Sequence, residues 1–311
     1  MPDPKPAKTA KIGPLRLILV AVGVVLVLAA ALAWLNRRTL ARDALTGWLK
    51  SKGVAADAEV EAFGPTTFTA RLTLGDPKNP DFAAEQAVVR YRPRLTGIEV
   101  VSVSLRKPVL RARLRASGLS VGSLDPLIRE FLRRPPRPDA AKPRISIDDG
   151  LLLLATDYGA LRIAADAVVD DGQLQSLAAT SAPARLRGPD FDVSLGAASL
   201  RQSATANRFD VSLTAPVTTA AVAGRTLSDG RLTLSAQGPY PDLVKRRGEG
   251  PVAIRAALAG RRLAGADQDL EAVTLSAGFD GRTAGWIQDL LVTGRATADL
   301  AADAVTSGAA R

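Results

Sequence analysis

The chain has 311 residues and a formal net charge of +10 at pH 7, and it contains neither cysteine nor histidine. These two absences exclude thiol nucleophiles, Ser-His-Asp triads, Cys/His zinc sites and imidazole acid–base catalysis. The sequence also lacks the glycine-rich loops that bind the phosphate groups of nucleotides. We therefore expect a protein that is not an enzyme and that uses no metal and no cofactor.

An apolar stretch near the start of the chain predicts a membrane-spanning helix. Residues 17–35 carry no charge, and a helix of that length is about 28 Å long, which matches the hydrocarbon core of a bilayer. Trp34, Arg37 and Arg38 are typical of the membrane interface. A cleavable signal peptide is the alternative, because residues 29–33 are mostly alanine. However, the apolar stretch exceeds the ~7–15 residues usual in signal peptides.

The topology follows from the size of the part that comes after this span. Long domains are translocated largely regardless of their charge. We therefore expect a cytoplasmic tail over 1–14, a transmembrane helix over 15–36 and the bulk of the chain in the periplasm. The protein is then a single-pass protein of a bacterial inner membrane with a cytoplasmic N-terminus.

The span continues into a predicted amphipathic stalk helix over 37–53. Leu40, Ala44 and Trp48 recur at helical spacing. Gly53 is suited to the C-terminal cap, so the helix is expected to end there.

A second, short helix is predicted near 124–133. Ser123 or Asp125 can serve as its N-cap, and Pro126 suits the first turn. The proline- and arginine-rich residues 133–144 then exclude regular structure and predict an exposed linker.

The rest of the chain has the alternation of β-strands, both in the region 54–132 and in a β-repeat domain over 145–311. Residues 67–75 alternate apolar and polar side chains, and "FDVSL" occurs at both 191–195 and 209–213. At ~12 residues per strand and turn, about 20 strands are expected, which is roughly 100 Å at ~4.8 Å per strand.

Paired acidic residues and Asp-Gly steps are interpreted as turns. Asp148-Asp149 and Asp170-Asp171 each precede glycine, and neighbouring carboxylates on an extended chain point to opposite faces, which disfavours a metal or catalytic site. The predicted Asp-Gly turns are Asp149-Gly150, Asp171-Gly172, Asp229-Gly230 and Asp280-Gly281.

The inward positions of these strands are small, and aromatic residues make up only 4% of the chain. This favours a mainly β fold in which an elongated, curled antiparallel sheet forms a repeating groove, apolar inside and wet outside. A β-sandwich with a dry core is the alternative. The alternation predicts the following groove residues: Phe68, Ala70, Leu72, Leu74, Val101, Val103, Leu105, Leu151, Leu153, Val193, Leu195, Val211, Leu213, Leu232 and Leu234.

The stretch "VSVSLRKPVLRARLR" (101–115) changes its apolar phase at Lys107-Pro108, which predicts a bulge or an edge position there. Arg111, Arg113 and Arg115 then lie on the wet side. With Arg37 and Arg38 they form a predicted membrane-proximal basic set. Nucleic acid is not an expected partner, because single-strand binders interleave such bases with aromatic residues.

The order of these features resembles the N-terminal portion of YdbH-like members of the AsmA/TamB superfamily. The resemblance rests on "LTLGDPKNPDFAAEQAVVRYRP" (72–93) and "VSVSLRKPVLRARLRASGLSVGSLDPLI" (101–128). The resemblance covers roughly residues 15–145, and beyond them it is limited to the general pattern of β-strands. It implies a periplasmic protein anchored in the inner membrane, whose β-groove conducts phospholipids between the two membranes. Its implied partners are phospholipids, the inner membrane and an outer-membrane lipoprotein or other envelope protein that completes the bridge.

Two functions from different classes fit this reading. The first is lipid transfer along the groove. The second is an envelope structural or assembly factor resembling the type II secretion N component, without lipid transport. A dry, closed core would favour the second function, and an open apolar face would favour the first.

Overall fold

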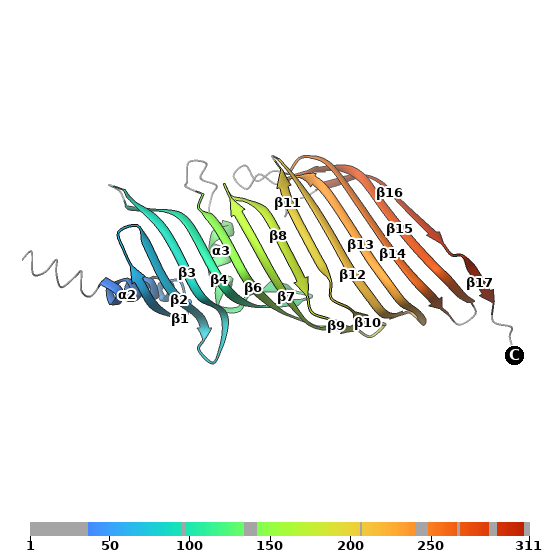
Figure 1. Cartoon of the computed structure of the whole chain (residues 1–311), viewed down its shortest axis with the longest axis horizontal. Helices are drawn as coiled ribbons and strands as arrows, with labels where there is room; N and C mark the ends of the chain where they lie inside the picture. The colour runs from blue at the N-terminus through green and yellow to red at the C-terminus, as the bar shows by residue number, and fades with distance from the viewer. Residues whose placement is uncertain are drawn as a thin grey trace, which may run out of the picture.

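The computed structural model describes residues 37–94, 97–133, 142–205, 207–240, 248–265, 268–285 and 291–307. The seventeen strands of these residues belong to one sheet, which extends as a single layer along the molecule (Figure 1). The predicted membrane span over 15–36 lies outside the described residues. None of the described helices is both long and apolar enough to cross a membrane.

The N-terminal strands form an antiparallel meander. They are β1 (Ala56–Phe63), β2 (Thr67–Asp76), β3 (Asn79–Arg94) and β4 (Gly97–Arg115), and the short β5 (Gly118–Ser120) pairs with the end of β4. The chain then leaves the sheet and returns as β6 (Arg144–Thr156), which pairs in parallel with β4. Parallel neighbours need a crossover of a dozen or more residues, and residues 121–143, between β5 and β6, provide it. The sheet is therefore mixed, and the prediction of a wholly antiparallel sheet is wrong at this pair.

The remaining strands continue the meander antiparallel. They are β7 (Gly159–Asp170), β8 (Gln173–Ser181), β9 (Ala184–Arg187), β10 (Phe191–Leu195), β11 (Ser199–Thr205), β12 (Arg208–Val222), β13 (Arg225–Pro239), β14 (Gly250–Ala264), β15 (Gln268–Ala284), β16 (Leu291–Ala301) and β17 (Ala304–Ser307). Three consecutive pairs, β8 with β9, β10 with β11 and β16 with β17, each share one position in the sheet.

The sheet is shorter than the sequence predicted, because its strands are longer. Several strands run for fifteen residues or more, among them β3, β4 and β12 to β15. Thirteen strand positions, at ~4.8 Å each, give about 60 Å rather than about 100 Å. The sheet is also not strongly curled, unlike the prediction (Figure 1). Small inward side chains permit curvature but do not impose it.

Three of the four Asp-Gly steps lie inside strands, so their prediction as turns is wrong. Only Asp171-Gly172 is a turn, whereas Asp149-Gly150, Asp229-Gly230 and Asp280-Gly281 are parts of β6, β13 and β15. Asp149 and Asp229 have φ of 55° and 50°, a left-handed conformation that aspartate tolerates better than most residues. The chain therefore kinks at these two positions without reversing.

The predicted irregularity at Lys107-Pro108 is confirmed. Lys107 has φ of 45°, and the register brings it beside Asp149 of β6, between the pairs Arg106–Asp148 and Val109–Leu151. In both strands, β4 and β6, the side chains that point to a given face switch from odd to even residue numbers or the reverse, and the two switches lie side by side. The apolar side chains on both sides of the kink consequently stay on one face of the sheet.

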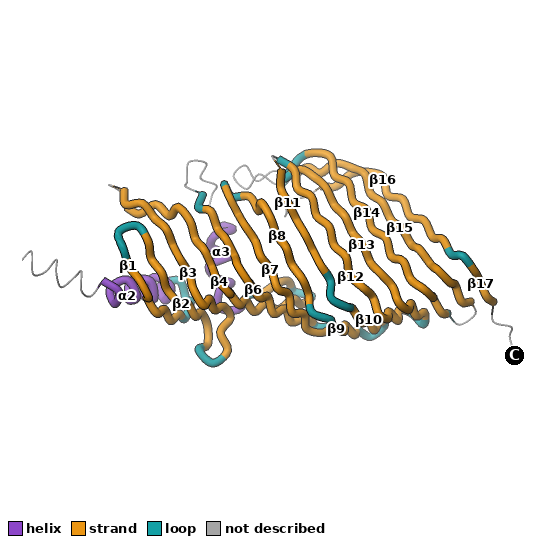
Figure 2. Tube along the Cα trace, viewed as in Figure 1, coloured by secondary structure: helices purple, strands orange, loops and turns teal. Residues whose placement is uncertain are grey.

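Two helices cover one end of the sheet (Figure 2). Helix α2 (Arg37–Ser51) falls within the predicted stalk and is followed by a turn at Gly53, whose φ is 77°. Helix α3 (Asp125–Arg133) follows the 3₁₀ turn η1 (Gly122–Leu124), and the Asp125 carboxylate accepts a hydrogen bond from the Val121 amide at 2.7 Å. Gly53 has the left-handed conformation expected of a helix C-terminal cap. Asp125 is the first residue of α3, and its carboxylate binds an amide upstream of the helix rather than one of the first turn.

The main buried cluster lies between these helices and the first strands. It consists of Leu49, Val54 and Leu74, and Phe82 and Leu127 pack against it. Leu49 belongs to α2 and Leu127 to α3, so both helices are fixed on the face of β2 and β3 that carries Leu74 and Phe82.

Candidate functional site: an uncovered apolar sheet face

The sheet has one apolar face, which cross-strand pairing defines from end to end. One row of paired residues, here called the central row, crosses all thirteen strand positions from β1 to β16. The central row consists of Val60, Ala70, Ala87, Leu105, Ile147, Ala167, Leu177, Gln202, Val211, Ala236, Ile254, Phe279 and Ala296. All of its members except Gln202 are apolar. We call the side of the sheet that carries this row the apolar face.

Rows on either side of the central row are apolar as well. Leu213 pairs with Leu200 and Leu234, and Leu275 pairs with Leu258 and Leu300. Because side chains alternate between faces along a strand, these residues share the apolar face with the central row.

The apolar face is not covered over most of its length. Among the described residues, no helix packs closely on the strands from β7 to β16. Leu275 is 43% exposed and Leu300 62% exposed, although both belong to an apolar row. The described part of the chain therefore has no dry core between two sheets, and the β-sandwich alternative is wrong for it.

Two aromatic rings on the apolar face, those of Phe279 and Phe209, lie over glycine. A Cβ atom built on Gly281 or Gly294 would come within 2.7 Å of the Phe279 ring, and one on Gly238 would meet the Phe209 ring at 3.0 Å. The absent side chains let each ring lie against the backbone. These aromatic rings consequently project little from the surface of the sheet.

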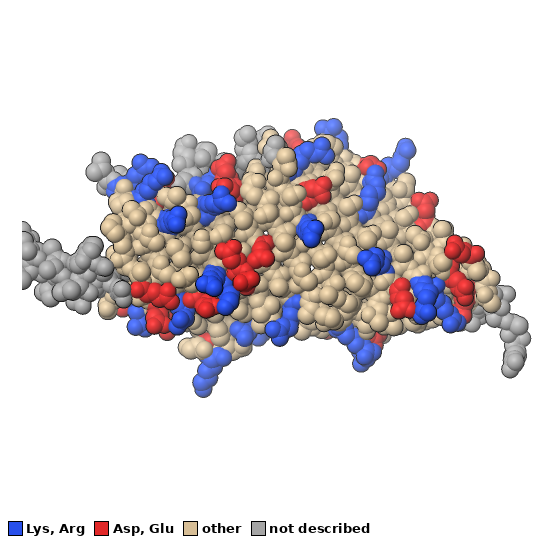
Figure 3. Space-filling model, in the orientation of Figure 1, with Lys and Arg blue, Asp and Glu red and all other residues tan. Residues whose placement is uncertain are grey.

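The opposite face is polar. Figure 3 views this side, because α3, which packs on the apolar face, lies behind the sheet in the same orientation. Basic and acidic side chains gather mainly along the two long edges, with fewer between them (Figure 3). Several of them pair across strands, as Arg255 does with Asp280 at 2.8 Å and Arg71 with Glu59 at 3.0 Å.

The structure brings most of the predicted groove residues onto the apolar face. These residues are Phe68, Ala70, Leu72, Leu74, Val103, Leu105, Val193, Leu195, Val211, Leu213, Leu232 and Leu234. Leu74 differs from the others, since it is buried beneath α2 and α3. The apolar face is thus closed by helices at its N-terminal end and open beyond it.

Three predicted groove residues lie elsewhere. Leu151 and Leu153 pair with Val109 and Arg111, on the polar side of β4. Their neighbours Leu152 and Leu154 occupy the apolar face instead. Val101 is the extra residue of a bulge opposite Arg90 and Tyr91.

The predicted basic residues do not form one patch. Arg37 and Arg38 begin α2, whereas the other three lie at the far end of β4. Arg113 and Arg115 are exposed, and half-buried Arg111 donates a hydrogen bond from Nη1 to the Pro80 carbonyl at 2.6 Å.

Pairing also identifies Gln202, which the sequence reasoning missed. Its side chain is 9% exposed, and its Oε1 atom is buried without a hydrogen-bond partner among the described residues. The alternation Leu200, Gln202, Ala204 could have placed it on the apolar face. No group of histidine, cysteine or acidic residues among the described positions is arranged to hold a metal ion.

Fold and site together define a single-layer β protein with an open apolar face. A family model described as "YdbH-like: Intermembrane phospholipid transport protein YdbH" matches residues 24–305. The chain therefore belongs to the YdbH-like family, a non-enzymatic lipid transport family of the cell envelope. No curated protein and no solved structure matches the chain significantly.

Proposed function

We propose that the apolar face carries the acyl chains of phospholipids, while their headgroups stay in water at the edges of the sheet. The observation that supports this proposal is the central row, which is apolar at every strand position except one and is uncovered beyond the helices. Burial of an acyl chain contributes about 0.8 kcal/mol per CH₂ group. A face that covers much of a chain can therefore extract a lipid without any chemical step.

In this proposal the protein is an inner-membrane protein with a single span over 15–36, a cytoplasmic N-terminus and a periplasmic sheet. Lipids move along the sheet between the inner and outer membranes. A partner that completes the path, such as an outer-membrane lipoprotein, would find the outer edge of β16 available for an added strand.

The alternative, an envelope assembly factor without lipid transport, expects a β domain filled by its own side chains. The uncovered leucines of β15 and β16 do not support it.

Photo-crosslinking tests the proposal with matched positions on the two faces. A photoreactive amino acid replaces Leu213 or Leu234 on the apolar face, or their neighbours Ser212 or Ser235 on the polar face. After irradiation in cells, we expect phospholipid adducts at both leucine positions and none at the serine positions, measured by mass spectrometry of the purified full chain. The absence of adducts at both leucines, or equal labelling of both faces, would refute the proposal.

A further inference from the structure

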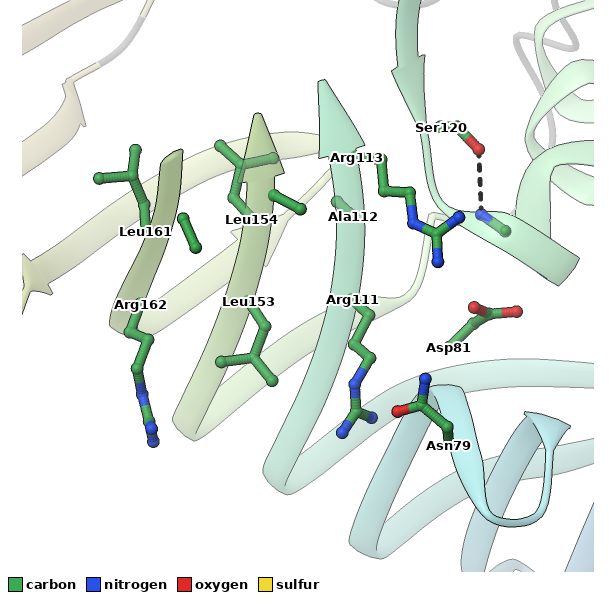
Figure 4. A pocket seen from close by; sticks show the side chains of 13 residues that line it. Asn79, Asp81, Arg111, Ala112, Arg113, Ser120, Leu153, Leu154, Leu161 and Arg162 are labelled. Carbon is green, nitrogen blue, oxygen red and sulfur yellow. Dashed lines mark hydrogen bonds between the residues drawn. The ribbon is translucent and has the colours of Figure 1, made fainter. Parts of the chain in front are cut away.

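A cavity of about 330 Å³ lies where one long edge of the sheet meets η1. Its walls come from the ends of β4 and β6, from the starts of β3 and β7, and from β5 (Figure 4). Arg111, Arg113 and Arg162 line it together with Leu154 and Leu161. The size falls at the lower end of the range usual for small-ligand sites.

The three arginines come from two strands of the sheet, β4 and β7. Arg111 and Arg113 belong to β4, and the hydrogen bond to the Pro80 carbonyl holds Arg111 in place. Arg113 is paired with Ser120 of β5 and extends toward it (Figure 4). Arg162 of β7 extends in the same direction as Arg111 (Figure 4).

The cavity has an excess of positive charge. No carboxylate of the described residues forms an ion pair with Arg111, Arg113 or Arg162. Asp81 also lines the cavity, but its carboxylate accepts a hydrogen bond from the Ser123 amide at 2.8 Å. Three guanidinium groups thus face one carboxylate that already has a partner.

The arginine pair of β9 differs from this cluster, because it has an ion-pair partner. Arg185 and Arg187 both bind Asp192, at 2.5 and 3.0 Å. The hydrogen bond from Arg185 is the main reason that the pKa of Asp192 falls to about 2. That carboxylate is therefore charged at any physiological pH. It offsets one of the two arginine charges, so one positive charge remains at this pair, whereas three arginines and Asp81 leave two in the cavity.

The apolar face reaches the wall of the same cavity. Leu154 pairs with Leu161 and with Ala112, all three on the apolar face. The three arginines lie on the opposite, polar face, where Leu153 pairs with Arg111 and Arg162. A molecule that places an anion among them would contact Leu153 there and would reach the apolar face around the edge of the sheet.

We propose that this cavity binds the phosphodiester group of a phospholipid, with the free N–H groups of Arg113, Arg111 and Arg162 as donors. Guanidinium groups match phosphate oxygens in geometry and charge. The inference rests on the proposed function and adds to it a fixed headgroup position at one edge of the sheet.

The test compares two photoactivatable lipids with identical acyl chains, a phosphatidylethanolamine and a diacylglycerol that lacks the phosphate. The full chain in detergent carries either Arg111→Gln, Arg113→Gln and Arg162→Gln together, or Arg113→Gln alone. Arg113 is exposed and forms no ion pair with any residue that the structure describes, so its single variant is expected to fold. The control carries Arg201→Gln, Arg231→Gln and Arg282→Gln, three exposed arginines outside the cavity with the same change in net charge.

We expect the triple cavity variant to bind the phospholipid at least about 10-fold more weakly and the diacylglycerol unchanged, with the control like the wild type. Equal phospholipid binding by the cavity and control variants would overturn the headgroup site while leaving the proposed function intact. Failure of the wild-type chain to bind either lipid would refute the proposed function itself. Displacement of the phospholipid by an equal concentration of inorganic phosphate would show a site for free phosphate and overturn the lipid assignment.

Discussion

Gln202 is the one polar side chain in the central row. Its Nε2 donates to the Leu174 carbonyl at 2.9 Å, and the Leu174 amide donates to the Tyr240 hydroxyl at 2.5 Å. A buried carbonyl oxygen without a partner costs about 1–3 kcal/mol. The chain tolerates this cost at the position where β8, β11 and the end of β13 come together.

A negative charge at this position should destabilise the sheet. In Gln202→Glu the carboxylate would face the Leu174 carbonyl in a buried site, and burial raises the pKa of the introduced carboxyl group. We expect a loss of about 2–4 kcal/mol at pH 8, measured by urea unfolding. The loss should shrink as pH falls through the raised pKa, because the protonated carboxyl is neutral and can donate to Leu174.

Gln237→Glu is the control, since Gln237 is exposed and bonds Asp210 on the polar face. Its effect should stay below about 1 kcal/mol. A Gln202→Glu loss that did not change with pH would contradict the burial argument.

Single residues were predictable from the sequence only where alternation was unbroken. Val211, Leu213, Leu232 and Leu234 lie in regular strands and were placed on the apolar face. The four consecutive leucines 151–154 have no alternation, so their phase depends on the kink at Asp149. That kink lies beside the one at Lys107 of β4, a cross-strand alignment that the local sequence does not reveal.

At the scale of elements, the aligned kinks of β4 and β6 keep one face apolar. Left-handed kinks inside strands also occur in the second half of the sheet, where Asp229 of β13 and Ala272 of β15 both have φ of 50°. Arg261 of β14 lies between them and pairs with Asp229 at 2.5 Å. Asp-Gly did not predict hairpin turns reliably, because its tolerance of positive φ also allows a kink within a continuous strand.

The glycine that follows the kink of β6 should not accept a side chain. A Cβ atom on Gly150 would lie 2.7 Å from Ile147 Cγ2 and 2.8 Å from the Ala165 carbonyl oxygen. We expect Gly150→Ala to cost about 1–3 kcal/mol, measured by chemical denaturation.

Gly47→Ala in α2 provides the opposite expectation. Nothing lies within 4 Å of its Cβ position, and alanine favours a helix over glycine by up to about 1 kcal/mol. If Gly150→Ala were as stable as the wild type, the close approach of β6 and β7 at this point would be wrong.

At the scale of the whole molecule, the sequence was sufficient for the β class, the two helices and the family. Its estimate of about 20 strands exceeds the seventeen of the described residues, because kinked strands continue through what had been interpreted as turns. Neither the parallel pairing of β4 with β6 nor the limited curl could be predicted, since both depend on where the chain returns after its helical crossover.

The two edges of the sheet lead to a prediction about β16. Every residue from Leu291 to Ala301 is exposed, and β15 is the only strand to which β16 is paired among the described residues. Peptides of β16 should therefore exchange amide hydrogens faster than those of β14, which has a partner on each side. Exchange mass spectrometry of the purified chain measures this. Equal protection of the two strands would show that another chain covers the edge.

The single layer has a consequence for how the protein holds together. Because each strand contacts only its immediate neighbours beyond the helical end, the free energy of folding is a sum of terms from adjacent pairs, as in linear repeat proteins. A disturbance in one pair is then felt nearby and decays with distance along the sheet. Such a molecule can deform locally as cargo passes, strand by strand, and recover behind it without a global transition.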